Sequence, residues 1–146
     1  HEGCAGLLAL GQYLNFLVGR SEAEEMRRQD AVSAFTRMEE FELPLQQRLI
    51  EFLKGAPGVR IIGPSHGGVN RVGTISFVSD RVSSIEIASE VNRRNIGIRY
   101  GHMYSHRLCQ ALGIDPSVGV VRVSFVHYNS LDEIDRLIAV LETILT

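Results

Sequence analysis

Residues 118–126 (VGVVRVSFV) restrict the fold of this 146-residue chain more than any other segment. The run is rich in β-branched and aromatic residues, which predicts a strand. Because successive side chains of a strand point to opposite faces, Val121, Val123 and Phe125 share one face and Arg122 lies on the other. We therefore expect a strand that packs one face into a core and carries a guanidinium on the opposite face.

The segments before this strand predict a small sheet with helices. Residues 4–18 predict a helix that is apolar over most of its surface. Apolar residues then recur at helical spacing in a long stripe that predicts a second helix, which ends at Gly55. We expect residues 21–30 to be the exposed start of that second helix, and Pro44 to kink or divide it near residues 40–43. From residue 59 onward the pattern predicts the order β-β-α-β-α-β-α, with elements at residues 59–62, 72–79, 84–95, 97–100, 105–112, 118–126 and from 130 on.

Two Ser-x-x-Glu capping boxes mark helix starts in this region, at Ser83 with Glu86 and at Ser130 with Glu133. Ser105 is the expected cap of the short helix. The predicted fold class is α+β: a small, mostly antiparallel sheet, covered on one face by helices and preceded by a long helix.

Composition narrows the class of protein. Hydrophobic residues make up 45% and charged residues 22%, as in ordinary globular domains. A net charge of -2 argues against sequence-independent nucleic-acid binding, and no apolar run approaches the roughly 20 residues that a transmembrane helix needs. Two cysteines, Cys4 and Cys109, are too few for a disulfide framework, so we expect a reducing compartment and a cytoplasmic protein.

The N-terminal segment predicts a fragment. The chain runs from His1 into an apolar helical pattern with no initiator Met and no charged region typical of a signal peptide. A helix that is apolar over most of its surface is normally buried on most sides. We therefore expect the chain to be the C-terminal piece of a longer protein.

Arg122 is the first candidate functional residue. A guanidinium fixed among valines is costly unless an anion meets it, and its planar fork of donors suits a carboxylate. The strand alone leaves three interpretations open: a substrate carboxylate site, an ion pair with an internal Asp or Glu, or an arginine that extends from a half-exposed strand.

Residues 99–106 (RYGHMYSH) form the second candidate, because two His, two Tyr and Arg99 lie between a strand and a helix, where loops often carry function. His102, His106 and Cys109 give an H-x3-H-x2-C pattern, but this is not a standard zinc arrangement, and no metal site is predicted. Cys109 falls in the middle of a helix, so we expect it, like Cys4, to be buried and inert.

Two other features carry less chemistry. The glycine-rich residues 63–68 match neither a P-loop nor a dinucleotide-binding fingerprint and predict a turn. Lys54 is the only lysine, and it stands at a helix C-terminus next to Gly55. We expect it to be exposed, whereas an imine-forming lysine usually needs desolvation.

The C-terminal run from Arg122 through Tyr128, Asn129 and Asp135 resembles the end of the class V aminotransferases, the pyridoxal-phosphate family that includes cysteine desulfurases. Residues 98–102 (IRYGH) resemble a loop of that family, and residues 1–3 resemble a stretch that follows its phosphate-contacting segment. The resemblance implies that residues 1–27 finish the large cofactor domain and residues 28–146 form the small C-terminal domain of a fold-type I enzyme.

The resemblance also implies roles. Arg122 would grip the α-carboxylate of an amino-acid-like small-molecule substrate, with Arg99, His102 and Tyr104 in a candidate active-site loop. Pyridoxal phosphate would be bound mainly by the upstream part, which supplies the Schiff-base lysine, so no catalytic, cofactor-binding or metal-binding residue is assigned in this chain. The full-length enzyme would be a homodimer that binds neither nucleic acid nor membrane.

One departure from the family separates its branches. Desulfurases that use a persulfide carry a cysteine in this loop, and Tyr104 stands at that position here. This disfavours a cysteine desulfurase of that type. The alternative to an enzyme fragment is a free-standing α+β binding or regulatory module without cofactor.

Overall fold

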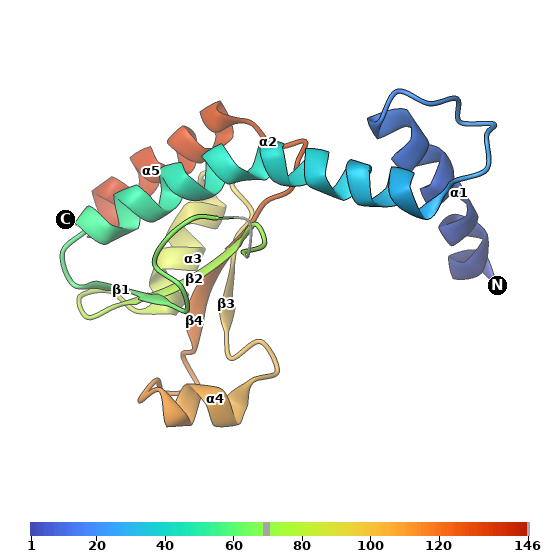
Figure 1. Cartoon of the computed structure of the whole chain (residues 1–146). Coiled ribbons are helices and arrows are strands. Elements are labelled where there is room, and N and C mark those ends of the chain that lie inside the picture. Colours follow the sequence, from blue (N-terminus) through green and yellow to red (C-terminus); the bar gives the residue numbers. More distant parts are fainter. Residues whose placement is uncertain (69–70, 146) are drawn as a thin grey trace. The chain divides into compact units, whose positions relative to one another are not determined.

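The computed structural model describes residues 1–68 and 71–145 (Figure 1). The chain divides into two compact units, His1–Phe41 and Glu42–Thr146. The long helix α2 (Arg28–Gly55) begins in the first unit and ends in the second. Within the described ranges, no helix is long and apolar enough to cross a membrane.

The first unit contains helix α1 (Glu2–Leu17) and a connection that precedes α2. Asn15 is fully buried, and its side-chain amide donates to the carbonyl oxygens of Ser21 and Glu24 at 3.3 and 2.7 Å. Arg20 pairs with both Glu24 and Asp30. The expectation that residues 21–30 begin a helix is therefore wrong for residues 21–27, because these polar contacts hold the segment in turns until α2 begins.

Helix α1 is largely exposed. Only Leu14 and Asn15 of this helix are buried, whereas Leu8 is 81% exposed and Phe16 is 62% exposed. The expected burial of α1 on most sides is thus wrong for this chain, since the described residues leave most of the apolar surface of α1 uncovered. Cys4 is exposed too, contrary to prediction.

Helix α2 continues through Pro44 without interruption, so the division expected near residues 40–43 does not occur. A proline inside a helix removes one backbone hydrogen bond. Packing offsets that loss here, because Leu45, Leu49 and Leu53 follow at helical spacing and are at most 2% exposed.

The second unit contains a four-stranded antiparallel sheet in the order β1-β2-β4-β3. Its elements are β1 (Val59–Ile62), β2 (Thr74–Ser79), α3 (Ser84–Arg93), β3 (Arg99–Gly101), α4 (His106–Ala111), β4 (Val120–Ser124) and α5 (Leu131–Leu145). This order and the α+β class confirm the sequence prediction.

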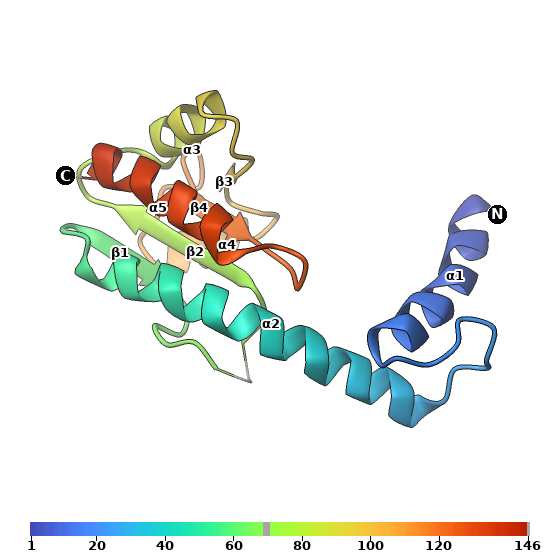
Figure 2. The same cartoon turned by 90° about the horizontal axis from the view of Figure 1, so that it is seen from above.

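Helices cover one face of this sheet, as Figures 1 and 2 show for α3 and α5. Side chains of β2 and β4 that point to this face, such as Phe77 and Val121, pack against α3, α5 and the C-terminal half of α2. Phe77 and Val121 are fully buried. The alternation in β4 therefore places its core face as predicted, and Arg122 lies on the opposite face, called the open face below.

The open face has an apolar half and a polar half. Cys109 of α4 and Ile114 pack with Val120, Ile62 and Val78 over the apolar half. The polar half consists of Thr74, Ser76, Arg99, Arg122 and Ser124.

Candidate functional site

Arg122 lies in the middle of the polar half of the open face. It is directly opposite Ser76 of β2 on one side and Arg99 of β3 on the other. The side chain is half-buried, and its Nε is buried without a hydrogen-bond partner. Among residues 1–68 and 71–145, no carboxylate lies within ion-pair distance of Arg122 or Arg99. The structure therefore gives no support to an internal ion pair for Arg122.

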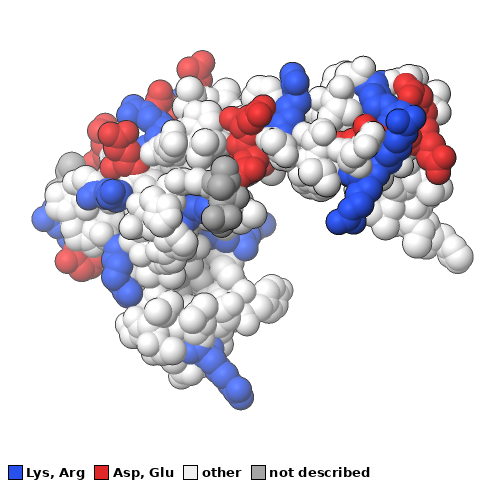
Figure 3. Space-filling view, in the orientation of Figure 1, with Lys and Arg blue, Asp and Glu red and all other residues white. Residues whose placement is uncertain are grey.

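Hydroxyl groups surround this arginine. The Oγ1 of Thr74 donates to the Oγ of Ser124 at 3.3 Å across the β2–β4 pair, and Ser76 lies beside Arg122. Figure 3 shows acidic side chains gathered over the helices α2 and α5, whereas the surface around α4 shows basic and uncharged atoms in that view. The polar half itself offers an anion the positive charge of Arg99 and Arg122 and the small hydroxyls of Thr74, Ser76 and Ser124.

The loop that follows β3 has an unusual backbone. Met103 and Tyr104 have φ angles of 47° and 62°, and Gly101 has a φ of 125°. A left-handed pair of non-glycine residues is uncommon and marks a tight turn, which is closed here by the Ser105 amide donating to the His102 carbonyl at 2.7 Å. Ser105 is the N-cap residue of α4, as predicted, but its side chain makes no capping hydrogen bond.

The side chains of this loop form an aromatic cluster. The His102 ring packs edge-on against Tyr104 and His106, with centroid distances of 6.5 and 5.9 Å. The Nδ1 of His102 is buried without a partner, while Tyr104 is fully exposed. Gly101 pairs with Val120, so the loop leaves the sheet two residues beyond the Arg99–Arg122 pair.

The H-x3-H-x2-C pattern does not assemble into a metal centre. Cys109 is 5% exposed and lies among apolar side chains, which confirms its predicted burial. In the described part of the chain, no three His, Cys, Asp or Glu side chains are grouped so that they could hold a metal ion.

The residues of this chain do not by themselves fit pyridoxal phosphate, which needs a lysine amine near the substrate. Lys54, the only lysine, is exposed in the last turn of α2. The C-terminal half of α2 covers the core face of the sheet, whereas Arg122 lies on the open face. The one lysine and the candidate carboxylate site are therefore on opposite sides of the sheet.

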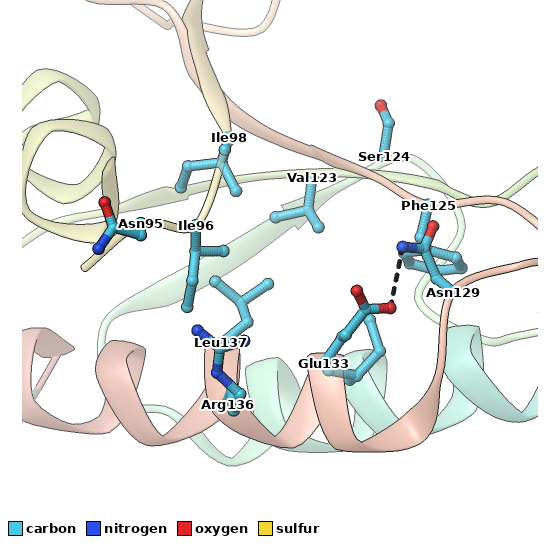
Figure 4. A pocket seen from close by; sticks show the side chains of 12 residues that line it. Asn95, Ile96, Ile98, Val123, Ser124, Phe125, Asn129, Glu133, Arg136 and Leu137 are labelled. Carbon is cyan, nitrogen blue, oxygen red and sulfur yellow. Dashed lines mark hydrogen bonds between the residues drawn. The ribbon is translucent and has the colours of Figure 1, made fainter. Parts of the chain in front are cut away.

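The structure also contains a pocket that the sequence did not indicate (Figure 4). Its volume is about 200 Å³, and it lies between α5 and the segments 95–98 and 123–125. Glu133 at its rim accepts from the Asn129 amide at 3.1 Å and from the Ser130 backbone at 2.9 Å, as Figure 4 shows for Asn129. These hydrogen bonds lower the pKa of Glu133, and the bond from the Ser130 backbone has the larger effect. Since Glu133 completes a capping box, its position is explained by the start of α5.

Comparison with known proteins identifies the family. The family model "Aminotransferase class-V" matches residues 5–137. The chain is 42% identical over 109 residues to the aminotransferase-like protein FGM3 of Gibberella zeae, covering 73% of this chain and 27% of that protein. It is 29% identical over 139 residues to a cysteine desulfurase of Pectobacterium carotovorum, covering 95% of this chain and 29% of that protein.

Solved structures agree with the sequence relatives. The apo structure of a cysteine desulfurase from Thermococcus onnurineus superposes with a TM-score of 0.67 at 29% identity, over 81% of this chain and 28% of the other. The chain thus spans between a quarter and a third of the length of these relatives. The shared fold and the match across most of the sequence show that this chain belongs to the class V aminotransferase family.

Proposed function

We propose that this chain is the substrate-binding part of a pyridoxal-phosphate-dependent class V enzyme that acts on an amino acid or a related amine, with Arg122 binding the substrate carboxylate. One observation carries the proposal: a half-buried guanidinium on the open face has a buried Nε without acceptor and no acidic partner among the described residues. A substrate carboxylate would supply the missing acceptors.

In this proposal the chain binds and orients. The planar fork of Arg122 takes two oxygens of a carboxylate, which fixes the direction of the substrate as well as its charge. Strand pairing on both sides of β4 holds Arg122 in place, and a site on a rigid strand is positioned more accurately than one on a loop. The cofactor, when bound, supplies the electron sink for chemistry at the amino carbon.

The remaining parts of the proposal concern the assembly. We infer that residues 1–27 complete a large domain that holds the cofactor and that residues 28–146 form the small domain, in a cytoplasmic homodimer. Family membership favours this enzyme over a free-standing binding module. Tyr104 has no thiol that could take up a sulfur atom from the substrate. The proposed reaction therefore does not pass through a persulfide on this loop.

The test is a pair of substitutions at Arg122 in the holoenzyme. Arg122→Lys and Arg122→Ala should both weaken the apparent affinity for the amino acid that is turned over, by about 10–150-fold, because a charge-assisted hydrogen bond contributes roughly 1.5–3 kcal/mol and one ammonium does not reproduce the planar fork. Arg107→Ala, which removes an exposed arginine from α4, is the matched control. Normal turnover by both Arg122 variants, with only a lower melting temperature, would show a structural role instead.

A further inference from the structure

We propose that the ligand of the open face carries two acidic groups, so that the substrate class is an amino acid with an acidic side chain or a related diacid. Arg122 binds the α-carboxylate and Arg99 binds the second acid. This inference rests on the proposed function and adds the identity of the substrate class to it.

The strand register places the two guanidiniums beside each other. Arg99 of β3 and Arg122 of β4 are direct partners in an antiparallel pair. Residues directly opposite each other project from the same face, with Cβ atoms about 4.5–5.5 Å apart. The neighbouring positions confirm the assignment of faces, because Ile98 and Val121 are both buried in the core on the other side.

Two like charges at such a position disfavour the fold unless something neutralises them, since like charges directly opposite each other are destabilising. Some arginines elsewhere in this chain have acidic partners, as Arg48 has Asp135 at 2.7 Å and Arg93 has Glu90 at 2.8 Å. In the part of the chain that the structure describes, neither Arg99 nor Arg122 forms an ion pair. One carboxylate neutralises only one of the two charges, and a ligand with two acidic groups neutralises both.

The exposure of the two side chains assigns their roles. Arg122 is half-buried in a central strand, and Arg99 is exposed on the edge strand β3. The more buried arginine is the better anchor for the group common to all amino-acid substrates. Arg99 then lies where a substrate side chain extends toward the sheet edge. The Cβ atoms are about 4.5–5.5 Å apart, and two long, flexible arginine side chains that start so close together can reach acids joined by about two or three carbons.

Binding of unreactive acids to the holoenzyme tests this inference. Succinate and glutarate each have a monoamide, succinamate and glutaramate, of nearly the same shape but with one acid fewer. None of the four compounds has an amino group, so calorimetry measures binding without turnover. We expect each diacid to bind at least about tenfold tighter than its monoamide, because the second acid adds a charge-assisted hydrogen bond.

Substitutions assign the preference to Arg99. Arg99→Gln should remove the preference for the diacid and leave the affinity for the monoamide within about twofold of wild type. Arg99→Lys keeps the positive charge in β3 and should retain part of the preference for the diacid. It also tests the role of Arg99 if the Gln variant does not fold. Arg107→Gln, an exposed arginine in α4, is the control for the loss of one positive charge.

The outcomes separate this inference from the proposed function. Equal affinity of wild type for diacid and monoamide, or a preference that persists in both Arg99 variants, would overturn the second acid site while leaving Arg122 as a carboxylate anchor. An Arg122→Gln variant that binds all four acids as wild type does would instead overturn the proposed function.

Discussion

Gly119 lies directly against the backbone of Gly101, so closely that a Cβ atom at position 119 would overlap the carbonyl group of Gly101. Gly119 also has a φ angle of 66°, in the left-handed region that favours glycine. The buried hydroxyl of Ser84 donates to its carbonyl at 3.0 Å. This contact fixes where β4 begins relative to the end of β3, and hence the pairing of Arg122 with Arg99.

Gly119→Ala should destabilise the chain by more than about 2 kcal/mol, since a left-handed backbone costs a residue with a Cβ roughly 1–2 kcal/mol and the overlap with Gly101 adds strain. The free energy of unfolding from urea denaturation measures the effect. Gly113→Ala is the matched control, because Gly113 has a similar φ of 68° but no atom within 4 Å of the added Cβ. Equal losses in the two variants would contradict the role of the close approach.

Acid should weaken the start of α5 through Glu133. Its pKa is lowered by the hydrogen bonds from Ser130 and Asn129. A carboxyl whose folded-state pKa lies below its unfolded value contributes stability above the unfolded pKa of about 4.3, and this stability is lost as the pH falls through the folded-state pKa. Glu133→Gln should therefore be less stable than wild type at neutral pH.

The test of this cap is how the difference in stability between wild type and Glu133→Gln changes with pH. Urea midpoints of wild type and Glu133→Gln should converge as the pH falls below 4, because the wild-type carboxyl then becomes uncharged as well. The same pH dependence is expected for Glu86 in the capping box of α3, where hydrogen bonds with Ser83 lower the pKa of Glu86. A difference that stays constant down to acidic pH would show that charge plays no part.

Much of the fold followed from local patterns. Both capping boxes are present: the Glu86 amide donates to Ser83 Oγ at 3.2 Å, and the Glu133 amide donates to Ser130 Oγ at 3.3 Å. These signals reside within four consecutive residues, so no tertiary information is needed to read them. The core face of β4 followed from alternation for the same reason.

Contacts between distant segments were not predictable in this way. The pairing of Arg99 with Arg122 depends on a register between strands that are 23 residues apart in sequence, and a shift by one residue would move Arg99 to the other face. The exposure of Cys4 and of α1 depends on what covers that helix, which its own periodicity does not contain. Pro44 does not divide α2, because tertiary packing around Leu45 and Leu49 outweighs one lost hydrogen bond.

Lys54 should not carry the cofactor. It is exposed on the side of the sheet opposite Arg122. Borohydride reduction of the 146-residue chain with pyridoxal phosphate, followed by peptide mapping, should yield no stoichiometric adduct at this residue. Lys54→Arg, which keeps the positive charge at the end of α2, should leave the cofactor content of the holoenzyme unchanged. A site-specific adduct at Lys54 would contradict the assignment of the imine-forming lysine to another part of the protein.

No persulfide should form on this chain when the holoenzyme is treated with cysteine. A persulfide mechanism needs a thiolate on an accessible loop, and the loop carries Tyr104, which is fully exposed and has no sulfur. Cys109 is 5% exposed and packs against Ile114 and Val120, so it reaches the loop only if α4 unfolds. Cys4 is exposed but belongs to α1 in the other unit.

Mass spectrometry after cysteine treatment measures the outcome directly, because a persulfide adds the mass of one sulfur atom, about 32 Da. Wild type should show no such adduct on Cys109, and Cys109→Ser should retain native activity. Tyr104→Cys provides the positive control, since it places a thiol at the loop position where persulfide-forming relatives have one. An adduct on Cys109 that disappears together with activity in Cys109→Ser would restore cysteine desulfuration as the reaction, and would require α4 to open during each turnover.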